Sequence, residues 1–262
     1  MSPEFCIVMP AYRAAGVLRA TVARIPDAVF ERGGTLLVVD DGSPDATAGI
    51  AEELARENNR VRVLNHPVNR GYGGAQKTGL REGLRLGCRG FAVLHADGQY
   101  APERVLDLLE PILSGRADLV QGSRMLGGGA REGGMPGFRY FANRALTTLE
   151  NLAFGTNLAE FHSGYMLYSR SLLESLPFES LQDNFNFDAE MILLAHLAGF
   201  PCHEVAIPTH YGEESSSLDP IPYGLNVLRM IGRHWSGHYR GLLEATSVNL
   251  GLKGAGNPDP PR

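Results

Sequence analysis

The chain has 262 residues, of which 44% are hydrophobic and 20% are charged, a balance that excludes an intrinsically disordered protein and suits a large folded domain. Its 24 basic and 29 acidic residues give a net charge of −5, which argues against a surface that neutralises nucleic-acid phosphates. The three cysteines are widely spaced and predict neither a disulfide framework nor a zinc site, so a reducing cytoplasm fits best.

We expect neither a signal peptide nor a membrane span. A strand-like run begins at Phe5, which leaves no room for a charged and then apolar leader. The longest apolar stretch, Met191–Phe200, is too short to cross a bilayer. We therefore expect a cytoplasmic protein, with peripheral attachment at the inner face of the plasma membrane as the alternative. The segment Tyr223–Trp235, with Arg229 and Arg233, is the candidate for that contact, although packing within the domain is commoner.

The first part of the chain alternates apolar strands with amphipathic helices. Short apolar runs predict buried strands at Phe5–Met9 and Thr35–Val39, and further strands at Val61–Leu64, Phe91–Leu94 and Ala117–Val120. Apolar residues at helical spacing predict the helices between them, beginning with one that carries Leu18, Val22, Ile25 and Val29. This alternation predicts an α/β fold, with a mostly parallel twisted sheet covered by helices on both faces.

The second half is less regular. A helix is marked by Phe138, Phe141, Ala145, Leu149 and Leu152, and it is followed by a strand at Tyr165–Tyr168, a helix at Asp188–Ala198, a strand at Glu204–Ile207 and a helix at Tyr223–Trp235. We predict one domain over residues 1–252. The Pro- and Gly-rich residues 253–262 are expected to form a disordered tail.

Polar loops follow four of the predicted strands, at Pro10–Arg13, Asp40–Pro44, Asn69–Gly74 and His95–Tyr100. Ligands of such sheets bind at the carboxyl ends of the strands. We therefore expect the four loops to form one pocket.

Asp97 is the sharpest candidate for a metal ligand. His95 and Gln99 flank it two residues away on either side, so an extended segment would present all three side chains on one side. Together they could hold a divalent cation that offsets a bound diphosphate. The alternative is an ordinary turn at the end of a strand.

Two further loops offer contacts for a ligand. One of Asp40 and Asp41 suits a structural role in the turn, while the other is free to bind a nucleobase or ribose; two adjacent acids also need a compensating partner. The glycine-rich segment Asn69–Gly74 could present backbone N–H groups to a ligand. Its glycine spacing differs from that of a dinucleotide-binding loop.

Six motifs, taken together, suggest a family. They are Pro10-Ala11-Tyr12, Val38 to Asp45, Asn69-Arg70-Gly71, His95 to Gln99, Gly122-Ser123-Arg124 and Ser163-Gly164-Tyr165. Over residues 4–215 the chain resembles family 2 of the inverting glycosyltransferases, which have the GT-A fold. The resemblance is strongest to the branch of dolichyl- and polyprenyl-phosphate mannosyl- and glucosyltransferases.

The resemblance implies a nucleotide-sugar-binding half at residues 1–121 and an acceptor-binding half at residues 122–252. Asp97 matches the last acid of the family's D-x-D metal motif and Gln99 a further ligand, with Mn²⁺ or Mg²⁺ as cofactor. Arg124 resembles a basic residue near the diphosphate, and Arg139 one in the acceptor region. Expected contacts with the donor or cofactor are Pro10, Ala11, Tyr12, Asp40, Asp41, Asn69, Gly71, Ala96, Asp97, Arg124 and Arg139.

Two positions depart from the family pattern. His95 replaces the first acid of D-x-D, and because imidazole suits Mn²⁺ better than Mg²⁺ we predict a preference for Mn²⁺. Met166 replaces an arginine that is frequent in the lipid-phosphate enzymes, which weakens the case for a phosphate-bearing acceptor.

Asp188 and Glu190, at the start of a predicted helix, are the candidates for a catalytic base. A hydroxyl acceptor needs a base, whereas a lipid phosphate arrives ionised. The two acids lie about 200° apart around the helix, so only one can face the cleft, and we favour Asp188. Acids in a first helical turn can also serve only to complement the helix dipole.

We therefore predict a metal-dependent, inverting glycosyltransferase of cell-envelope or glycan biosynthesis. It would move a sugar from a GDP- or UDP-linked donor to a sugar, another hydroxyl or a polyprenyl phosphate, with no nucleic-acid partner. The alternatives are a polyprenyl-phosphate mannosyl- or glucosyltransferase specifically, a nucleotide-sugar-binding protein without activity, and, more weakly, a nucleotidyltransferase.

Overall fold

A seven-stranded sheet organises the computed structural model, which describes residues 3–209 and 220–249. In spatial order the strands are β3 (Val61–Asn65), β2 (Gly34–Asp40), β1 (Phe5–Ala11), β4 (Gly90–Val93), β6 (Met166–Ser169), β5 (Leu119–Ser123) and β7 (Cys202–Ala206). Neighbouring strands are parallel, except that β6 runs antiparallel to both β4 and β5. The predicted α/β fold with a mostly parallel sheet is confirmed.

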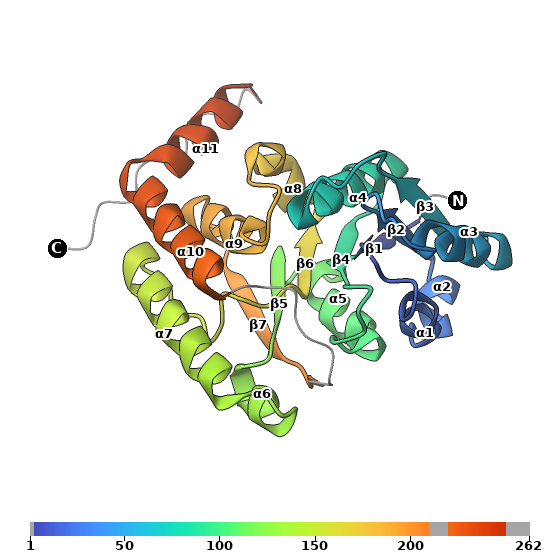
Figure 1. Ribbon diagram of the computed structural model, residues 1–262. Coiled ribbons are helices and arrows are strands. Elements are labelled where there is room, and N and C mark those ends of the chain that lie inside the picture. Colours follow the sequence, from blue (N-terminus) through green and yellow to red (C-terminus); the bar gives the residue numbers. More distant parts are fainter. Residues whose placement is uncertain (1–2, 210–219, 250–262) are drawn as a thin grey trace.

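Helices cover both faces of this sheet (Figure 1). They are α1 (Leu18–Ala23), α2 (Asp27–Glu31), α3 (Thr47–Glu57), α4 (Tyr72–Leu86), α5 (Val105–Leu113), α6 (Gly129–Glu132), α7 (Gly137–Phe154), α8 (Arg170–Ser175), α9 (Phe187–Leu197), α10 (Pro220–Trp235) and α11 (His238–Asn249). Short 3₁₀ turns lie at Pro102–Arg104, Leu126–Gly128 and Phe178–Ser180. Helices α7 and α10 pack together at the end of the molecule remote from α1–α3.

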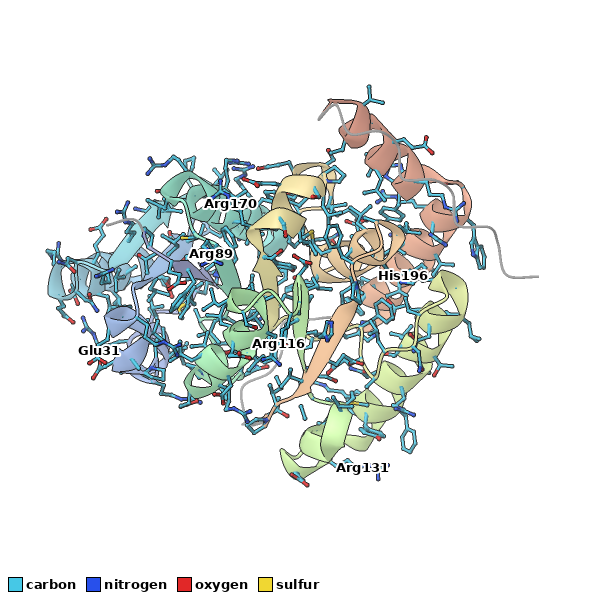
Figure 2. The ribbon with its side chains drawn as sticks, turned by 180° about the vertical axis from the view of Figure 1, so that it is seen from behind. Glu31, Arg89, Arg116, Arg131, Arg170 and His196 are labelled. Carbon is cyan, nitrogen blue, oxygen red and sulfur yellow. The ribbon has the colours of Figure 1, made fainter. Side chains whose placement is uncertain are left out.

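The central strands are buried on both faces. Cys6 and Val8 of β1 belong to a core shared with α4 and α9, whereas Phe5, Ile7 and Met9 belong to a core shared with α1 and α5. Figure 2 shows the opposite side of the molecule, with side chains filling both faces of the sheet. Strands covered on both sides need near-continuous apolar sequence, which is why their positions were predictable.

Three features differ from the sequence-based expectations. The helix expected from Leu18 to Val29 is two helices, because Pro26 fixes its own φ and disfavours helical backbone at Ile25. The antiparallel direction of β6 and the helix α11 were not predicted. The tail expected at residues 253–262 lies outside the described residues.

Candidate functional site

A pocket of about 280 Å³ opens where β4 and β5 end and β6 begins. It brings together six of the residues singled out from the sequence: His95, Asp97, Gln99, Arg124, Arg139 and Asp188. Residues of α7, α9 and α10 form the wall away from β1, so the pocket joins the two halves of the chain.

The remaining predicted donor contacts lie outside this pocket. Pro10, Ala11, Tyr12, Asp40, Asp41, Asn69 and Gly71 gather where β1 and β2 end, beside the loop that follows β3. Ala96 is buried, and its carbonyl accepts a hydrogen bond from the Thr21 hydroxyl at 2.9 Å. The four expected loops therefore form a pocket and a neighbouring cluster at the same sheet edge.

The adjacent acids Asp40 and Asp41 are both buried but have different surroundings. Asp41 Oδ1 lies 2.6 Å from His66 Nδ1, and the carboxylate also accepts the backbone N–H groups of Arg70 and Gly71 at 2.9 Å. Asp40 accepts only the N–H of Ser43 at 3.3 Å, while its buried Oδ1 has no hydrogen-bond partner among the described residues. Asp41 is thus structural, with His66 as its compensating partner, and Asp40 keeps an acceptor for a ligand.

The glycine-rich loop does not offer its N–H groups to a ligand as expected. Gly73 and Gly74 donate to the backbone carbonyl of Asp183, at 2.8 and 3.3 Å, and Gly71 donates to Asp41. A Cβ atom at Gly71 would lie 2.5 Å from the Asp183 carbonyl oxygen. The glycines therefore allow close packing against another loop, which corrects the expectation for Gly71. The exposed Asn69 accepts the Gly71 N–H at 3.0 Å.

Asp97 lies half-buried at the pocket wall. Its Oδ1 accepts the backbone N–H of Gln99 at 3.0 Å, and its Oδ2 accepts no hydrogen bond from the residues described. Within the described ranges no group of three or more His, Cys, Asp or Glu side chains could enclose a metal ion. One carboxylate suffices where substrate phosphates and water complete the shell. Asp97, with the Gln99 amide beside it, thus fits a cation shared with a diphosphate.

His95 takes part in a different contact from the one predicted. Its Nε2 lies 2.5 Å from Tyr72 Oη, and its ring packs edge-on against Tyr72 and Tyr100. Burial lowers the pKa of His95, and the Asp97 charge opposes this only in part, so the ring is neutral at pH 7. Only Nδ1 remains for another partner, which corrects the expectation of an imidazole fully available to a cation.

Asp188 is the buried acid of the pocket. Tyr72 Oη donates to its Oδ2 and Gln76 Nε2 to its Oδ1, both at 2.8 Å. Burial raises the pKa of Asp188 to about 6, although these two hydrogen bonds favour the charged form. A carboxyl group with this pKa changes protonation close to physiological pH, which suits acid–base chemistry.

Glu190 faces elsewhere, as the helical geometry requires. Its carboxylate accepts the Gln182 N–H at 2.8 Å and the Tyr239 hydroxyl at 2.6 Å, and Arg233 lies 3.7 Å away. It does not line the pocket. This placement corrects its candidacy as a base, because these contacts tie α9 to α10, α11 and the loop before α9.

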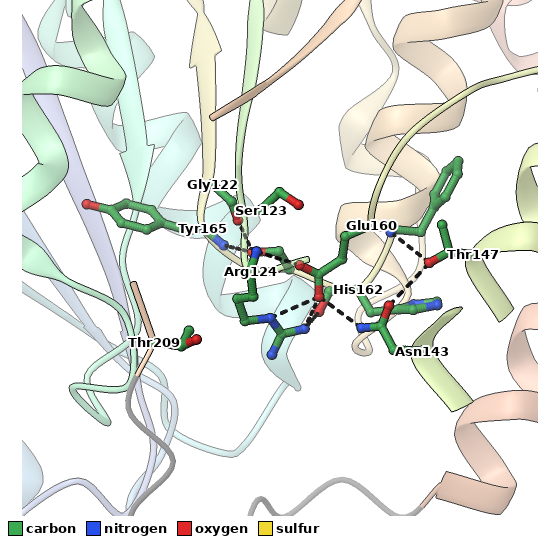
Figure 3. A network of polar contacts seen from close by, with 12 residues as sticks. Gly122, Ser123, Arg124, Asn143, Thr147, Glu160, His162, Tyr165 and Thr209 are labelled. Atoms are coloured by element: carbon green, nitrogen blue, oxygen red, sulfur yellow. Dashed lines mark hydrogen bonds and ion pairs between the residues drawn. The ribbon is translucent and has the colours of Figure 1, made fainter. Parts of the chain in front are cut away.

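Arg124 and Glu160 form a buried ion pair beside the pocket, shown in Figure 3. Arg124 Nε donates to Glu160 at 2.9 Å, and its guanidinium also donates to the His162 carbonyl at 2.5 Å. Asn143 of α7 donates to the same carboxylate at 2.9 Å. Burial would raise the pKa of Glu160, but the Arg124 charge and hydrogen bonds outweigh it and lower that pKa. The Arg124 charge is therefore largely balanced within the protein.

Several residues that line or support the pocket were not singled out as site candidates. Tyr72, Tyr100, Asn143 and Tyr223 line it, whereas Gln76 and Glu160 hydrogen-bond to residues that line it. Tyr72 lies inside the glycine-rich motif, and Gln76 follows it by one helical turn. Helical spacing from a motif residue could therefore have revealed Gln76. Glu160 and Tyr223 carry no such signal, because only the tertiary fold brings them to the pocket.

Comparison with known proteins agrees with this geometry. Residues 6–176 match the model of glycosyl transferase family 2. The chain is 33% identical over 201 residues to the undecaprenyl-phosphate mannosyltransferase of Micrococcus luteus, covering 76% of this chain and 81% of the relative. It is 32% identical over 203 residues to the polyprenol monophosphomannose synthase of Mycolicibacterium smegmatis, covering 77% and 75%.

Solved structures give the same fold. Glucosyl-3-phosphoglycerate synthase from Mycobacterium tuberculosis, in complex with uridine diphosphate, superposes with a TM-score of 0.59 at 18% identity, covering 97% of this chain and 82% of that one. That protein has also been crystallised with Mn²⁺ and with Mg²⁺. The fold is GT-A, and together with the match over residues 6–176 it leads to one conclusion: this chain is an enzyme of glycosyltransferase family 2.

Proposed function

We propose that this glycosyltransferase moves a sugar from a GDP- or UDP-linked donor to a polyprenyl phosphate at a membrane surface, as a step of cell-envelope or glycan biosynthesis. The observation that carries the proposal is the pocket itself, in which Asp97 faces a wall built by α7 and α10. The names of the two bacterial mannosyltransferases support a lipid-phosphate acceptor and a mannosyl donor.

We assign donor binding to residues 1–121. Asp40 Oδ1, which has no hydrogen-bond partner in the part of the chain that the structure describes, suits a hydrogen bond from a base N–H or a ribose hydroxyl. Asp97 and Gln99 would hold a divalent cation, Mn²⁺ or Mg²⁺, whose charge offsets the charge that develops on the leaving nucleoside diphosphate. Tyr12, nearly half exposed beside this cluster, offers an aromatic face to the base.

We assign acceptor binding to residues 122–252, with Arg139 as the main phosphate ligand. Arg139 lies on the first turn of α7, lines the pocket and forms no ion pair with the residues described. The Arg124 charge is balanced by Glu160, so Arg139 supplies positive charge to the pocket. Met166 is fully buried in β6, and Arg139 compensates for the missing arginine there.

In the proposed reaction an oxygen of the acceptor phosphate attacks the anomeric carbon. The bond from that carbon to the donor's diphosphate oxygen breaks, and its electron pair leaves on the nucleoside diphosphate. Because the attack comes from the face opposite the leaving group, the configuration at the anomeric carbon is inverted. The phosphate oxygen is already ionised, so no base is required. Asp188, held by Tyr72 and Gln76, accepts a hydrogen bond from a sugar hydroxyl and orients the ring.

Helix α7 supports a site at a membrane, because its polarity is inverted. Its buried face carries Asn143, Thr147 and Glu150, whereas Phe141 and Leu152 are 69% and 79% exposed. No described helix is long and apolar enough to span a bilayer. An exposed apolar helix face instead suits insertion into the headgroup region of one leaflet.

The charges near α7 suit an anionic surface. Arg144 is exposed on α7, and Arg229 and Arg233 are exposed on α10. The acid of α7, Glu150, is buried, and α10 contains none in its sequence. In a symmetric contact between two copies of the chain, the positive charges of these arginines would face one another and repel. Anionic lipids are therefore the partner that this surface fits. Its positive charge is local, because the chain as a whole has a net charge of −5.

A hydroxyl acceptor is the second candidate, and one observation favours it. Asp188 has a pKa of about 6 and lines the pocket, so it could take a proton from an attacking hydroxyl. In that case Asp188 would be a catalytic base.

One assay separates the two acceptors. The purified protein is incubated with labelled GDP-mannose or a labelled UDP-sugar, Mn²⁺ or Mg²⁺, and undecaprenyl phosphate in detergent. We expect labelled product that extracts into organic solvent and is released by mild acid, as a sugar phosphodiester would be. Label transferred only to added sugars, or no label in the organic phase with any donor, contradicts a lipid-phosphate acceptor.

A further inference from the structure

Glu150 is a buried acid that the proposed reaction does not use. It lies on α7 with an exposed fraction of 0%, and neither carboxylate oxygen accepts a well-aligned hydrogen bond from the residues described. Its nearest charged partner is His162, whose Nε2 lies 3.1 Å from Oε2. A lone ionised carboxylate in such surroundings would cost several kcal/mol. The His162 imidazole is therefore the group that Glu150 needs as its partner.

The other nitrogen of His162 contacts α10. Its Nδ1 lies 2.6 Å from Tyr223 Oη, and both rings line the pocket. The main chain of His162 is fixed by Arg124, which donates to its carbonyl oxygen. Figure 3 shows His162 next to the Arg124–Glu160 pair. Glu150, His162 and Tyr223 thus form a chain of polar contacts that ends at the pocket.

The tautomer of His162 determines the hydrogen at Tyr223. An imidazole that carries a proton on Nδ1 donates it to Tyr223 Oη. We assign this tautomer to His162, which leaves the phenol hydrogen free for another acceptor. Burial holds the pKa of Tyr223 well above its usual value, so the phenol keeps that hydrogen.

We propose that Tyr223 donates this hydrogen to an anionic oxygen of the acceptor, and that His162 and Glu150 are positioning residues that keep the phenol oriented towards it. The proposal rests on the proposed function, since it assumes an acceptor that carries a phosphate. It assigns a specificity role to α10: the phenol favours an acceptor oxygen that can accept a hydrogen bond.

The test uses the full chain with undecaprenyl phosphate in detergent. In Tyr223→Phe we expect kcat/KM for the lipid phosphate to fall by about 10-fold to 100-fold, as for loss of a hydrogen bond to a charged group. The KM for the nucleotide-sugar should stay unchanged, which also shows that the variant is folded. Glu150→Gln, which removes the acid that biases the imidazole proton, should cause a smaller loss in the same direction.

The matched control is Tyr239→Phe. Tyr239 is a buried tyrosine on α11 that donates to a carboxylate, Glu190, at 2.6 Å but lies outside the pocket. Its removal should leave the acceptor kcat/KM unchanged. In the Tyr223→Phe background Glu150→Gln should have no further effect, because its influence passes through the phenol.

The outcomes distinguish this inference from the proposed function. If the wild type gives no lipid product, the proposed acceptor is wrong. If the wild type is active but Tyr223→Phe retains its acceptor kcat/KM, or if Glu150→Gln and Tyr223→Phe lower it additively, the role of Tyr223 is wrong while the proposed function stands.

Discussion

At the scale of single residues, each acid of the site takes its role from the donors that surround it. Asp41 accepts two backbone N–H groups and contacts His66, so it has little capacity left for a ligand. Asp40, its neighbour in sequence, retains a buried oxygen without a partner in residues 3–209 and 220–249. The sequence predicts that the two acids divide these roles but not which acid takes which, because the deciding donors lie in the loop after β3.

Asp188 should reduce the stability of the folded protein at neutral pH. Its pKa is raised by burial from 3.8 to about 6, so the folded state favours the protonated acid. The stability of the folded protein with a protonated Asp188 is fully present below about pH 4, and it is lost as the pH rises through about 6 and the buried carboxyl group must ionise. The loss of stability corresponds to about 3 kcal/mol at most. An asparagine at this position would recover only part of it, because its NH₂ group would face one of the two hydrogen-bond donors, Tyr72 Oη or Gln76 Nε2.

At about pH 8 the free energy of unfolding of Asp188→Asn should therefore exceed that of the wild type by about 1–3 kcal/mol, so the variant should unfold at a higher urea concentration. Near pH 4 the difference should vanish. Urea titrations at both pH values measure this directly. A variant less stable than the wild type at pH 8 would show that the Asp188 carboxylate is not penalised by burial.

The pH dependence of kcat tests the role of Asp188. A phosphate monoester loses its second proton near pH 6 (about the pKa of Asp188), so the wild-type rate should rise between about pH 5 and 7 in either account. In Asp188→Asn we expect the same rise at a lower plateau, since the acceptor phosphate still titrates. A flat profile in the variant would make Asp188 the catalytic base.

The contact between His95 and Tyr72 gives a prediction about the metal. Because Nε2 is engaged by Tyr72, we expect His95→Asn to leave the ratio of Mn²⁺- to Mg²⁺-supported activity within about twofold of the wild-type ratio, even where both activities fall. Steady-state rates at saturating concentrations of each metal measure it. If the activity ratio of the variant shifts clearly towards Mg²⁺, the His95 imidazole is a metal ligand after all.

At the scale of elements, α7 shows where periodicity misleads. The spacing of Phe138, Phe141, Leu149 and Leu152 predicts the helix correctly, but these residues are its exposed side. The usual assumption that an apolar stripe faces the core fails, because the pocket needs polar groups on the buried side. For α10 the expectation holds at Val227, Met230 and Ile231, whereas Trp235 is 72% exposed.

This inversion predicts binding to vesicles. The double variant Phe141→Ser and Leu152→Ser should reduce partitioning onto anionic vesicles by at least about 10-fold, because two exposed apolar side chains no longer insert. Vesicle flotation measures it. Val68→Ser, which alters an exposed valine between β3 and α4, is the control and should bind as the wild type does. If the double variant floats with the vesicles as much as the wild type does, a membrane role for α7 is contradicted. A wild type that does not bind vesicles and forms a dimer would contradict it as well.

At the scale of the whole molecule, the sheet determines which predictions could succeed. Four of the first five predicted strands are apolar runs buried on both faces, and only the edge strand β3 is largely unburied. The positions of these four strands and the loops at their carboxyl ends therefore follow from composition and spacing. The antiparallel β6 inserts between β4 and β5 and brings His162 to the pocket. Such long-range pairing leaves no periodic signal, which is why the wall of α7 and α10 was not predicted.

The central claim is that Asp97 and a divalent cation hold the donor's diphosphate. Isothermal titration of UDP and GDP into the wild type and Asp97→Asn, each with Mn²⁺ and with metal chelated, tests it most directly. We predict that Mn²⁺ tightens binding of at least one nucleotide to the wild type by about 10-fold or more, and that the folded variant shows no such enhancement. An equal Mn²⁺ enhancement in Asp97→Asn would contradict the account.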